Sequence, residues 1–294
     1  MSVQQLWLTL RFRNSVFAGL MALLLVAMVL PLVPHATPVD AVPESVQVPI
    51  VMYHLVLKDP ARASKYVIPP ETLESDLRWI RDHGYETVTA EDLIAYVHRG
   101  TPLPEKPIVL TFDDSYTNNY TYAYPLLDRF GMRAVLSVIG SVTDRYTVSG
   151  DENPNYANLT WSRIRELSES GVFEIQNHTY DLHRNDGPRK GCKRLAGESV
   201  ESYQALLLRD LSQNQDAIER AIGVRPKVFV YPFGAIRPES VEVIKRMGFS
   251  ASFSCEEGVN LLRMGDIDGL FLLKRKNRPA GISSDDFFQS LNLF

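Results

Sequence analysis

Residues 107–114 read PIVLTFDD, an apolar and β-branched run that is followed at once by two aspartates. A short run of this kind is typical of a strand buried on both faces, as the strands of parallel sheets are. The stretch therefore predicts one strand of a parallel sheet, with two carboxylates at its carboxyl end. Comparable runs recur along the chain, at 48–53, 86–89, 134–139, 172–177, 227–232, 250–254 and 269–274.

Helical patterns fall between these predicted strands. Alternating strands and helices predict an α/β fold with a parallel sheet. About eight strand–helix steps in roughly 245 residues fit one barrel-like domain better than two open sheets, and in such barrels the chemistry lies at the carboxyl ends of the strands. Apolar residues recur at helical spacing, mostly ending at a glycine, over 71–83, 91–99, 160–171, 199–222 and 239–247.

The composition argues against several classes of protein. The chain has 294 residues, of which 45% are hydrophobic and 22% are charged, and its formal net charge is -4. These values predict a folded protein and argue against a basic surface that binds nucleic acid. Two cysteines, Cys192 and Cys255, are too few for a zinc ribbon or an iron–sulfur site, which leaves one disulfide or two free thiols. Any metal site must therefore use histidine and carboxylate ligands.

Residues 15–33 form an almost unbroken apolar run that follows two arginines. Nineteen residues in a helix extend about 28 Å, close to the thickness of the hydrocarbon core of a bilayer. The basic flank predicts that the N-terminal end stays in the cytoplasm and that the rest is exported. The domain is then extracytoplasmic, either membrane-anchored at the cell surface or secreted if the segment is cleaved. We expect an anchor or signal sequence at 1–34, a linker at 35–47, and the folded domain at 48–294.

Polar residues or unusual backbone follow four of the predicted strands. A single aspartate in such a place is most often a turn or capping residue, and a single histidine is more often structural than catalytic. Two adjacent aspartates are harder to explain in this way, because successive side chains of an extended chain point in opposite directions and can serve two roles. The residues concerned are His54, Asp113 with Asp114, His178, and Phe233 with Gly234.

The spacing of His178 and His183 restricts how the two rings can share an ion. Five residues in a helix would place the rings about 140° apart, so they cannot bind from one helical face. His178 must end a strand and His183 must return from a turn. One carboxylate and two imidazoles suit a catalytic site for zinc, cobalt or another first-row divalent ion, with positions left for water and substrate.

Three ordered motifs, VLTFDD (109–114), NHTYDLH (177–183) and YPFG (231–234), resemble those of a known family. They are similar to the motifs of the polysaccharide deacetylases, also called carbohydrate esterase family 4 or the NodB homology domain. The stretch MYHL (52–55) looks most like the branch that deacetylates poly-N-acetylglucosamine. The resemblance implies a single distorted (β/α) barrel. It also implies metal-dependent hydrolysis of N-acetyl groups on a cell-surface or cell-wall polysaccharide, either poly-N-acetylglucosamine or peptidoglycan.

The resemblance implies roles for individual residues. Asp114, His178 and His183 would hold the metal. Asp113 would be the general base, and a backbone N–H near Phe233 would help to stabilise the oxyanion. Substrate contacts are expected from Tyr231 and Phe233 of the third motif. Tyr116, just after the aspartate pair, is a candidate because aromatic rings stack on sugars, and Arg275, at the end of the last predicted strand, is a further candidate.

The chain departs from the family's pattern at two positions that concern catalysis. Members commonly carry an arginine that orients the base two residues before the proline of the third motif, but Val230 stands there, and Arg275 is a candidate substitute. Many members also carry a late histidine as general acid. No histidine follows His183, so His54 is the candidate for that role or for a substrate contact. Two alternatives stay open: an O-acetyl esterase acting on xylan or wall glycan, and a glycan-binding module without turnover.

Overall fold

The computed structural model describes residues 43–291 of the chain. The predicted anchor or signal sequence at 1–34 and most of the predicted linker therefore lie outside the described residues. Within 43–291, no helix is both long enough and apolar enough to cross a membrane.

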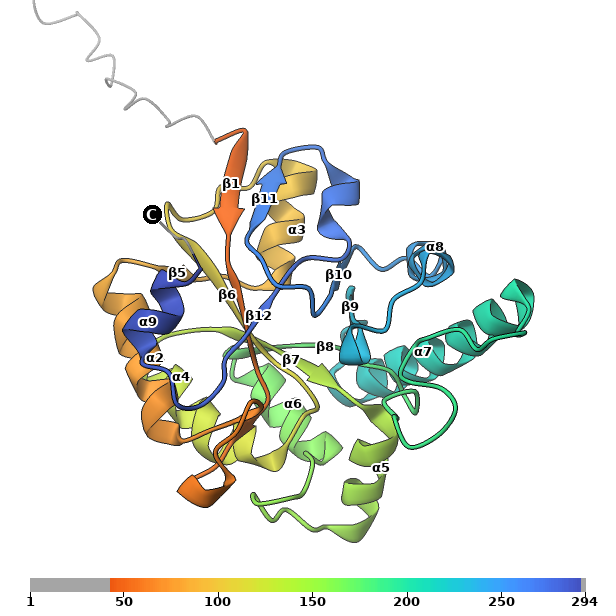
Figure 1. The fold of residues 1–294 in the computed structure, drawn as a ribbon, viewed down its shortest axis with the longest axis horizontal. Coiled ribbons are helices and arrows are strands. Elements are labelled where there is room, and N and C mark those ends of the chain that lie inside the picture. Colours follow the sequence, from red (N-terminus) through yellow and green to blue (C-terminus); the bar gives the residue numbers. More distant parts are fainter. Residues whose placement is uncertain (1–42, 292–294) are drawn as a thin grey trace, which may run out of the picture. The chain divides into compact units, whose positions relative to one another are not determined.

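A curled parallel sheet forms the centre of the molecule (Figure 1). Seven strands follow the order β10-β9-β8-β7-β6-β2-β12, and β5 pairs with the start of β6. A further parallel bridge joins Phe253, at the end of β10, to Leu273, so that the chain from Leu273 to β12 connects the two edges of a half-barrel. The strands are β2 (Ile50–Tyr53), β5 (Glu86–Thr87), β6 (Pro107–Phe112), β7 (Ala134–Val138), β8 (Phe173–Asn177), β9 (Val228–Val230), β10 (Ala251–Phe253) and β12 (Lys276–Asn277).

The helices lie around the outside of this sheet (Figure 1). All five predicted helices are confirmed, with ends that differ by one or two residues. Side-chain caps set two of the starts, because Thr160 accepts the Arg163 N–H before α6 and Ser199 accepts the Ser202 N–H before α7. The helices are α2 (Pro70–Asp82), α3 (Ala90–Arg99), α4 (Tyr124–Phe130), α5 (Gly140–Ser149), α6 (Trp161–Glu169), α7 (Val200–Ile222), α8 (Pro238–Arg246) and α9 (Ser284–Gln289), with short turns η1 (Pro60–Arg62), η2 (Asn119–Ala123), η3 (Pro232–Gly234) and η4 (Ile267–Leu270).

Two small sheets flank the central one, and they correct the predicted linker. β1 (Ser45–Val48) pairs antiparallel with β11 (Asn260–Arg263), and β3 (Leu55–Val56) pairs with β4 (Val67–Ile68). The linker predicted at 35–47 is therefore wrong over its last three residues. Its composition does not favour a strand, but β11 provides a partner that lies far along the chain.

The strand predicted at 269–274 is also wrong. The chain forms the short helix η4 there, because Asp266 accepts the Gly269 N–H and closes a turn. Leu272 then adopts a left-handed conformation with φ 62°, which an extended strand does not allow. The strand that pairs with β2 comes slightly later, as β12.

The register of the sheet brings the carboxyl ends of neighbouring strands together. Tyr53 of β2 lies opposite Phe112 of β6, and Val138 of β7 lies opposite Asn177 of β8. Since parallel strands end at the same edge, the residues that follow β2, β6 and β8 emerge at one end of the half-barrel.

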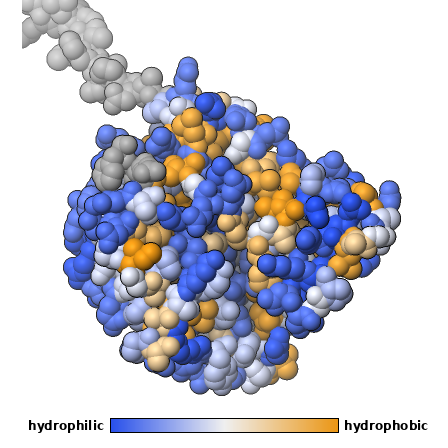
Figure 2. Space-filling model, viewed as in Figure 1, coloured by the Kyte–Doolittle hydropathy of each residue, from blue (hydrophilic) through white to orange (hydrophobic). Residues whose placement is uncertain are grey.

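Apolar side chains are concentrated inside the domain. β2, β6 and β7 are buried along their whole length, with core residues on both faces of the sheet. Figure 2 shows the apolar residues of one face of the surface in small patches, separated by hydrophilic residues. Patches of this kind are ordinary for a soluble domain, so this view gives no sign of a large apolar interface.

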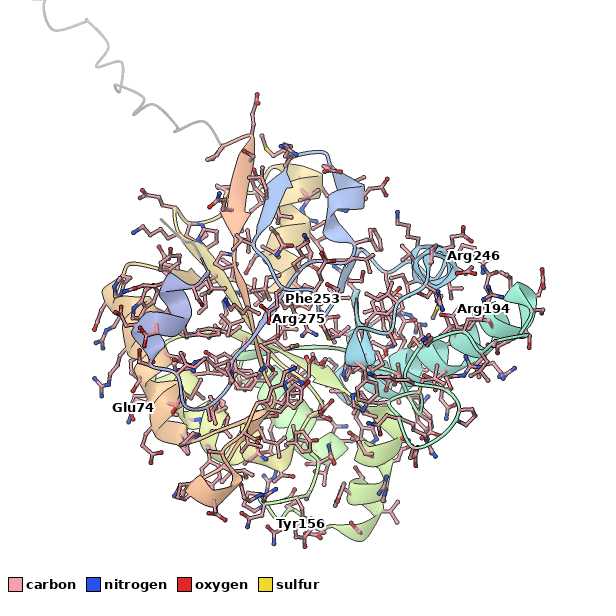
Figure 3. All side chains as sticks on the ribbon, in the orientation of Figure 1. Glu74, Tyr156, Arg194, Arg246, Phe253 and Arg275 are labelled. Carbon is pink, nitrogen blue, oxygen red and sulfur yellow. The ribbon has the colours of Figure 1, made fainter. Side chains whose placement is uncertain are left out.

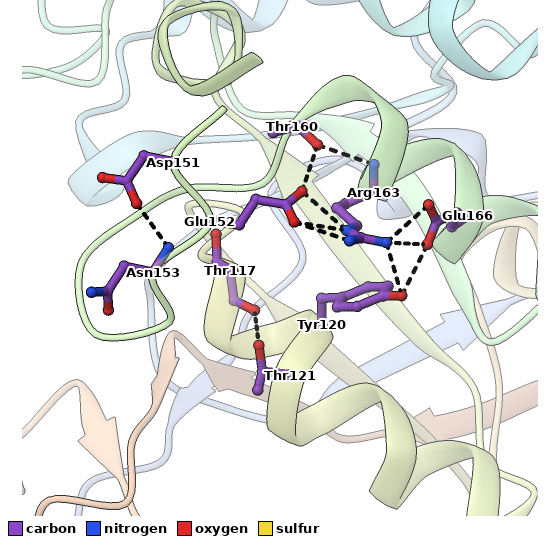
Figure 4. Close-up of polar contacts among 9 residues, drawn as sticks. All are labelled: Thr117, Tyr120, Thr121, Asp151, Glu152, Asn153, Thr160, Arg163 and Glu166. Carbon is purple, nitrogen blue, oxygen red and sulfur yellow. Dashed lines mark hydrogen bonds and ion pairs between the residues drawn. The ribbon is translucent and has the colours of Figure 1, made fainter. Parts of the chain in front are cut away.

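A charged network holds the loop between α5 and α6 in place (Figure 4). Arg163 of α6 pairs with Glu152 of the loop at 3.0 Å and with Glu166 at 2.8 Å. The same loop carries Asn158, whose side-chain amide donates to the Asp114 carbonyl oxygen at 2.7 Å. The network therefore supports the backbone of the aspartate pair from outside.

A second, buried ion pair fastens the chain after β12 to α2. Nε of Arg278 lies 2.9 Å from Oδ2 of Asp76, and both side chains are fully buried. The hydroxyls of Tyr53 and Ser284 also donate to Asp76, at 3.0 Å and 2.6 Å. One carboxylate thus connects α2, β2, α9 and the segment after β12.

Asp76→Ala is expected to lower the free energy of unfolding by about 3–5 kcal/mol, because it leaves the Arg278 guanidinium buried without a counter-ion. Urea denaturation would measure this loss. The matched control is Glu74→Ala on the same helix, whose carboxylate pairs at the surface with Arg78 and Arg129 (Figure 3). The control should leave the unfolding free energy almost unchanged. Similar small losses in both variants would contradict the assignment of Asp76 as a structural anchor.

Candidate functional site

A cavity of about 480 Å³ opens at the carboxyl ends of β2, β6 and β8. Motifs that are distant in sequence meet there: the predicted catalytic and metal-binding residues all line it, namely His54, Asp113, Asp114, His178 and His183. Of the predicted substrate contacts, Tyr116 and Phe233 line the cavity as well. The other walls come from Met52, Leu55, Lys65, Tyr66, Asn185, Lys190, Cys255, Glu257 and Asn277.

The backbone turns sharply at the end of β6 and separates the two aspartates. Asp114 and Ser115 both adopt left-handed conformations, with φ 71° and 51°. The two carboxylates do face different partners, as the sequence predicts. The predicted reason, an extended chain, is wrong, because the backbone turns at Asp114. Left-handed backbone is easiest for glycine, and here the residues at both positions are small and polar.

Three side chains converge in the cavity with the spacing of a metal site. Oδ1 of Asp114 lies 3.4 Å from Nε2 of His178 and 3.1 Å from Nε2 of His183. One ligand atom from each of the three residues lies within 4.8 Å of the other two. Burial raises the pKa of Asp114, but its contacts with the two histidines lower it well below its ordinary value. Burial likewise lowers the pKa of His183, and Asp114 raises it by more.

The donor atoms in this cluster fit a divalent cation. Nδ1 of His178 lies 2.7 Å from the Val230 carbonyl oxygen, which can only accept, so Nδ1 donates there and Nε2 is the ring nitrogen that faces Asp114. Oδ1 of Asp114 is buried and has no hydrogen-bond partner among the described residues. A buried carboxylate oxygen without a hydrogen-bond partner is costly unless a positive charge lies beside it.

Asp113 is buried beside this cluster and is held by an arginine. Nη1 and Nη2 of Arg275 donate to its two oxygens, both at 2.9 Å, and the Ser137 hydroxyl donates at 2.9 Å. Burial raises the pKa of Asp113, but the positive charge of Arg275 and the nearby His178 lower it to about 2. Asp113 is therefore ionised at neutral pH and fixed in orientation.

Arg275 contacts Asp113, so it can take the place of the arginine that is absent at position 230. The Val230 side chain is buried, and its position contributes only a backbone carbonyl, which orients His178. The arginine that contacts Asp113 comes instead from the segment before β12, in the middle of the molecule. Its guanidinium carbon lies 5.7 Å from the centre of the Phe253 ring (Figure 3). The prediction that Arg275 contacts the substrate is wrong, because its side chain is fully buried against Asp113.

His54 lines the same cavity as Asp114, His178 and His183. Its ring packs edge-on against Tyr66 with 4.8 Å between centroids, and its Nδ1 is buried with no hydrogen-bond partner among residues 43–291. Burial lowers the pKa of His54, and the carboxylates of Asp114 and Asp113 offset this only in part. His54 is therefore neutral at neutral pH and has a nitrogen available for a ligand.

The remaining predicted substrate contacts divide into two groups. Phe233, in a left-handed conformation with φ 57°, packs against His183 at 4.3 Å between ring centroids, and Tyr116 lies against Asp114. Tyr231 is a wrong prediction for its side chain. It is fully buried and contacts the Ser240 hydroxyl at 3.0 Å, because the chain turns after β9 and directs it into the core.

The two cysteines are free thiols. Cys192 is buried in the core, and Cys255 lies on the cavity wall with its sulfur 3.8 Å from the Tyr231 carbonyl oxygen. Of the two alternatives that the sequence leaves open, the structure therefore has the unpaired thiols.

The sequence does not predict two residues that support the aspartate pair. Ser137, the hydrogen-bond donor to Asp113, is the one polar residue within the apolar strand β7, and that interruption is a signal that could have been used. Asn158 supports Asp114 from a loop with no local pattern, so only the fold reveals it.

Comparisons with known proteins agree on one family. A family model described as polysaccharide deacetylase matches residues 100–252. The poly-beta-1,6-N-acetyl-D-glucosamine N-deacetylase of Escherichia coli (strain K12) is 26% identical over 248 residues, which cover 78% of this chain and 37% of that protein. The chain thus spans well under two thirds of the length of this curated relative.

Two solved structures have folds similar to that of this chain. The de-N-acetylase of Aggregatibacter actinomycetemcomitans matches with a TM-score of 0.71 and 26% identity, over 85% of this chain and 100% of that one. IcaB from Ammonifex degensii matches with a TM-score of 0.68 and 25% identity, over 84% of this chain and 96% of that one.

Proposed function

Because the chain belongs to the polysaccharide deacetylase family, we propose that it is a metal-dependent hydrolase that removes N-acetyl groups from a cell-surface or cell-wall polysaccharide. One observation carries the proposal. An ionised and oriented carboxylate, Asp113, lies in the same cavity as the Asp114, His178 and His183 cluster. The name of the Escherichia coli relative favours poly-N-acetylglucosamine over peptidoglycan as the substrate.

The residues of the cavity have separate roles in the proposed amide hydrolysis. Asp114, His178 and His183 would hold a divalent ion, with zinc as the first candidate and cobalt or another first-row metal as alternatives. Such an ion supplies Lewis-acid polarisation of a carbonyl and makes water more acidic. Asp113 accepts the proton of the attacking water, and Arg275 and Ser137 keep its oxygens in place. A backbone N–H near Phe233 is the candidate donor to the oxyanion.

His54 is the candidate that donates a proton to the departing nitrogen. No histidine follows His183, and His54 is the remaining imidazole that lines the cavity. Its lowered pKa makes the protonated ring a stronger acid, although fewer molecules carry the proton at neutral pH.

His54→Ala is expected to lower kcat for acetate release by about 10²-fold, the low end of the range for acid–base catalysis. Zinc affinity should stay unchanged, because His54 is outside the cluster of ligand atoms. The matched control is His98→Ala, at an exposed position of α3. Wild-type kcat in His54→Ala would remove His54 from the mechanism.

Acetate release by the full chain tests the proposed function directly. The substrates are β-1,6-linked N-acetylglucosamine oligomers, peptidoglycan and acetylated xylan, each with zinc, with cobalt and with a chelator. We expect release from the oligomers that stops with the chelator and returns with metal. Release from xylan alone would indicate an O-acetyl esterase. Metal binding without any release would indicate a glycan-binding module.

We also propose that the domain acts outside the cytoplasm. The apolar run at 15–33 and its basic flank support this location. Cell fractionation combined with N-terminal sequencing of the recovered protein tests it. An intact N-terminus in the membrane fraction would indicate an anchor, and a shortened protein outside the cytoplasm would indicate cleavage. Recovery from the cytoplasm alone would contradict the proposal.

A further inference from the structure

Helix α7 carries buried polar side chains on the face that packs against the metal-binding loop. Asp210 is 9% exposed and Asn214 is fully buried, four residues apart and so on the same side of the helix. The buried face of an amphipathic helix is normally apolar. Buried polar groups persist where they are hydrogen-bonded, so the partners of these two side chains indicate what the helix does there.

The loop that joins His178 to His183 needs support from outside itself. It leaves β8 through Thr179, whose φ of 75° is left-handed. A β-branched residue in this conformation is strained and persists only where the surroundings impose it. The bend is nevertheless required, because it returns His183 towards Asp114.

Asp210 meets this bend from the side of α7. Its two carboxylate oxygens accept the N–H groups of Tyr180 and Asp181, each at 2.8 Å. These two residues lie midway between the histidines. A carboxylate suits this place because two neighbouring N–H donors require two acceptors. Burial raises the pKa of Asp210 to about 6, and the two N–H bonds oppose the rise, so the group is ionised at neutral pH.

Asn214 holds the start of the same loop. Its side-chain amide donates to Val138 O at 2.8 Å and to Oδ1 of Asn177 at 2.9 Å. The same Asn177 oxygen accepts the Thr179 N–H at 2.9 Å, and its amide donates to Leu211 O of α7 at 3.0 Å. Helix α7 therefore contacts the loop at two points, the end of β8 and the bend.

Helix α5 closes the loop from the other side. The N–H groups of Gly140 and Ser141 donate to Thr179 O at 3.2 Å and Tyr180 O at 2.8 Å. A side chain at position 140 would not fit, because its Cβ would lie 2.5 Å from both the Asn214 amide oxygen and the Tyr180 ring. The bend is thus enclosed between two helices, and Asp210 supplies both of its acceptors on the α7 side.

We infer that Asp210 is a positioning residue for the metal centre: by fixing the N–H groups of Tyr180 and Asp181, it holds His183 in register with His178 and Asp114. The inference rests on the proposed function, because it requires that these residues bind a metal ion. Groups that orient metal ligands from behind typically account for 10–100-fold in affinity.

The test compares zinc affinity in the full-length wild type, Asp210→Asn and Asp216→Asn, each stripped of metal and titrated in competition with a chromophoric chelator. Asparagine has the shape of aspartate, but it offers one acceptor and places an N–H₂ group against the second donor. We expect zinc to bind about 10–100-fold more weakly to Asp210→Asn. The control Asp216→Asn lies on the same helix, 52% exposed and paired with Arg225, and should keep wild-type affinity.

Three further measurements separate positioning from a loss of folding. Thermal unfolding of the metal-free proteins shows whether Asp210→Asn is folded at the temperature of the titration. Hydrogen exchange at the amides of Tyr180 and Asp181 should be faster in the variant, and the visible absorption of bound cobalt should change with the ligand geometry. If Asp210→Asn does not fold, Asp210→Glu, which keeps both acceptor oxygens on a longer side chain, is measured in the same way.

The outcomes distinguish a failure of this inference from a failure of the proposed function on which it rests. A wild type that binds neither zinc nor cobalt would contradict the proposed metal-dependent hydrolase. A wild type that binds zinc and a folded variant that binds it equally well would overturn the role of Asp210 alone. Weaker binding with unchanged exchange at Tyr180 and Asp181 would also overturn it, because the loss would then not pass through the bend.

Discussion

Asp113→Asn is expected to lower kcat for acetate release by about 10²–10⁴-fold, the range typical of a general base. Asparagine can accept the hydrogen bond of Ser137 and one from Arg275, so the shape of the site is retained. It cannot accept the proton of the attacking water. The proposed metal ligands are Asp114, His178 and His183, so zinc affinity should change little. Acetate release at saturating zinc, together with a zinc titration, measures both quantities.

The control for this variant is Asp82→Asn, at the end of α2, where the side chain is 58% exposed and pairs with Arg81. This variant should match the wild type in kcat and in zinc affinity. If Asp113→Asn kept more than about a tenth of the wild-type kcat, general-base catalysis by this residue would be excluded. A large loss of zinc affinity in Asp113→Asn would instead place Asp113 among the metal ligands.

Arg275→Met is expected to lower the free energy of unfolding by about 3–5 kcal/mol, because it leaves the Asp113 carboxylate buried and unpaired. Both partners are almost fully buried, with exposed side-chain fractions of 0% and 2%, so water cannot screen the remaining charge. In the wild type, the pKa of about 2 at Asp113 lies below the ordinary 3.8. The ionised pair therefore stabilises the fold at neutral pH, and this contribution is lost as the pH falls through about 2.

A double-mutant cycle tests the origin of that loss. The variant Asp113→Asn/Arg275→Met removes both charges, so it should be more stable in urea than Arg275→Met alone. Losses that simply add would contradict a direct coupling of the two residues. Arg163→Met is the control: Arg163 pairs with the carboxylates of Glu152 and Glu166, but its side chain is a third exposed, so its removal should lower the free energy of unfolding by less.

Much of the fold could be predicted from the sequence, because short buried strands have a strong local signature. The strand at 107–112 is confirmed at both ends, and the five helices follow from apolar spacing and caps. Elements that depend on a distant partner could not be predicted. Nothing in the residues of β1 indicates a strand until β11 lies beside it, and β12 is defined only by its pairing with β2.

The residues of the candidate site could likewise be predicted only in part. Asp113, Asp114, His178 and His183 could be found because each follows a predicted strand or has a telling spacing, and parallel strands bring such ends together. Their supports could not be found in this way. Tyr231 was misplaced because a strand pattern does not reveal where the chain turns at Pro232. Asp210 stands in an ordinary amphipathic helix, and only the packing of α7 gives it a role.

In each of the two buried ion pairs, the aspartate is synthesised long before its arginine partner. Arg275 and Arg278 lie 162 and 202 positions after their partners Asp113 and Asp76. At about 5–20 residues per second, a ribosome takes on the order of ten seconds to travel from one partner to the other. During that time each nascent carboxylate lacks the guanidinium that makes its burial favourable. The half-barrel and the orientation of the Asp113 carboxylate are therefore completed together, late in biosynthesis.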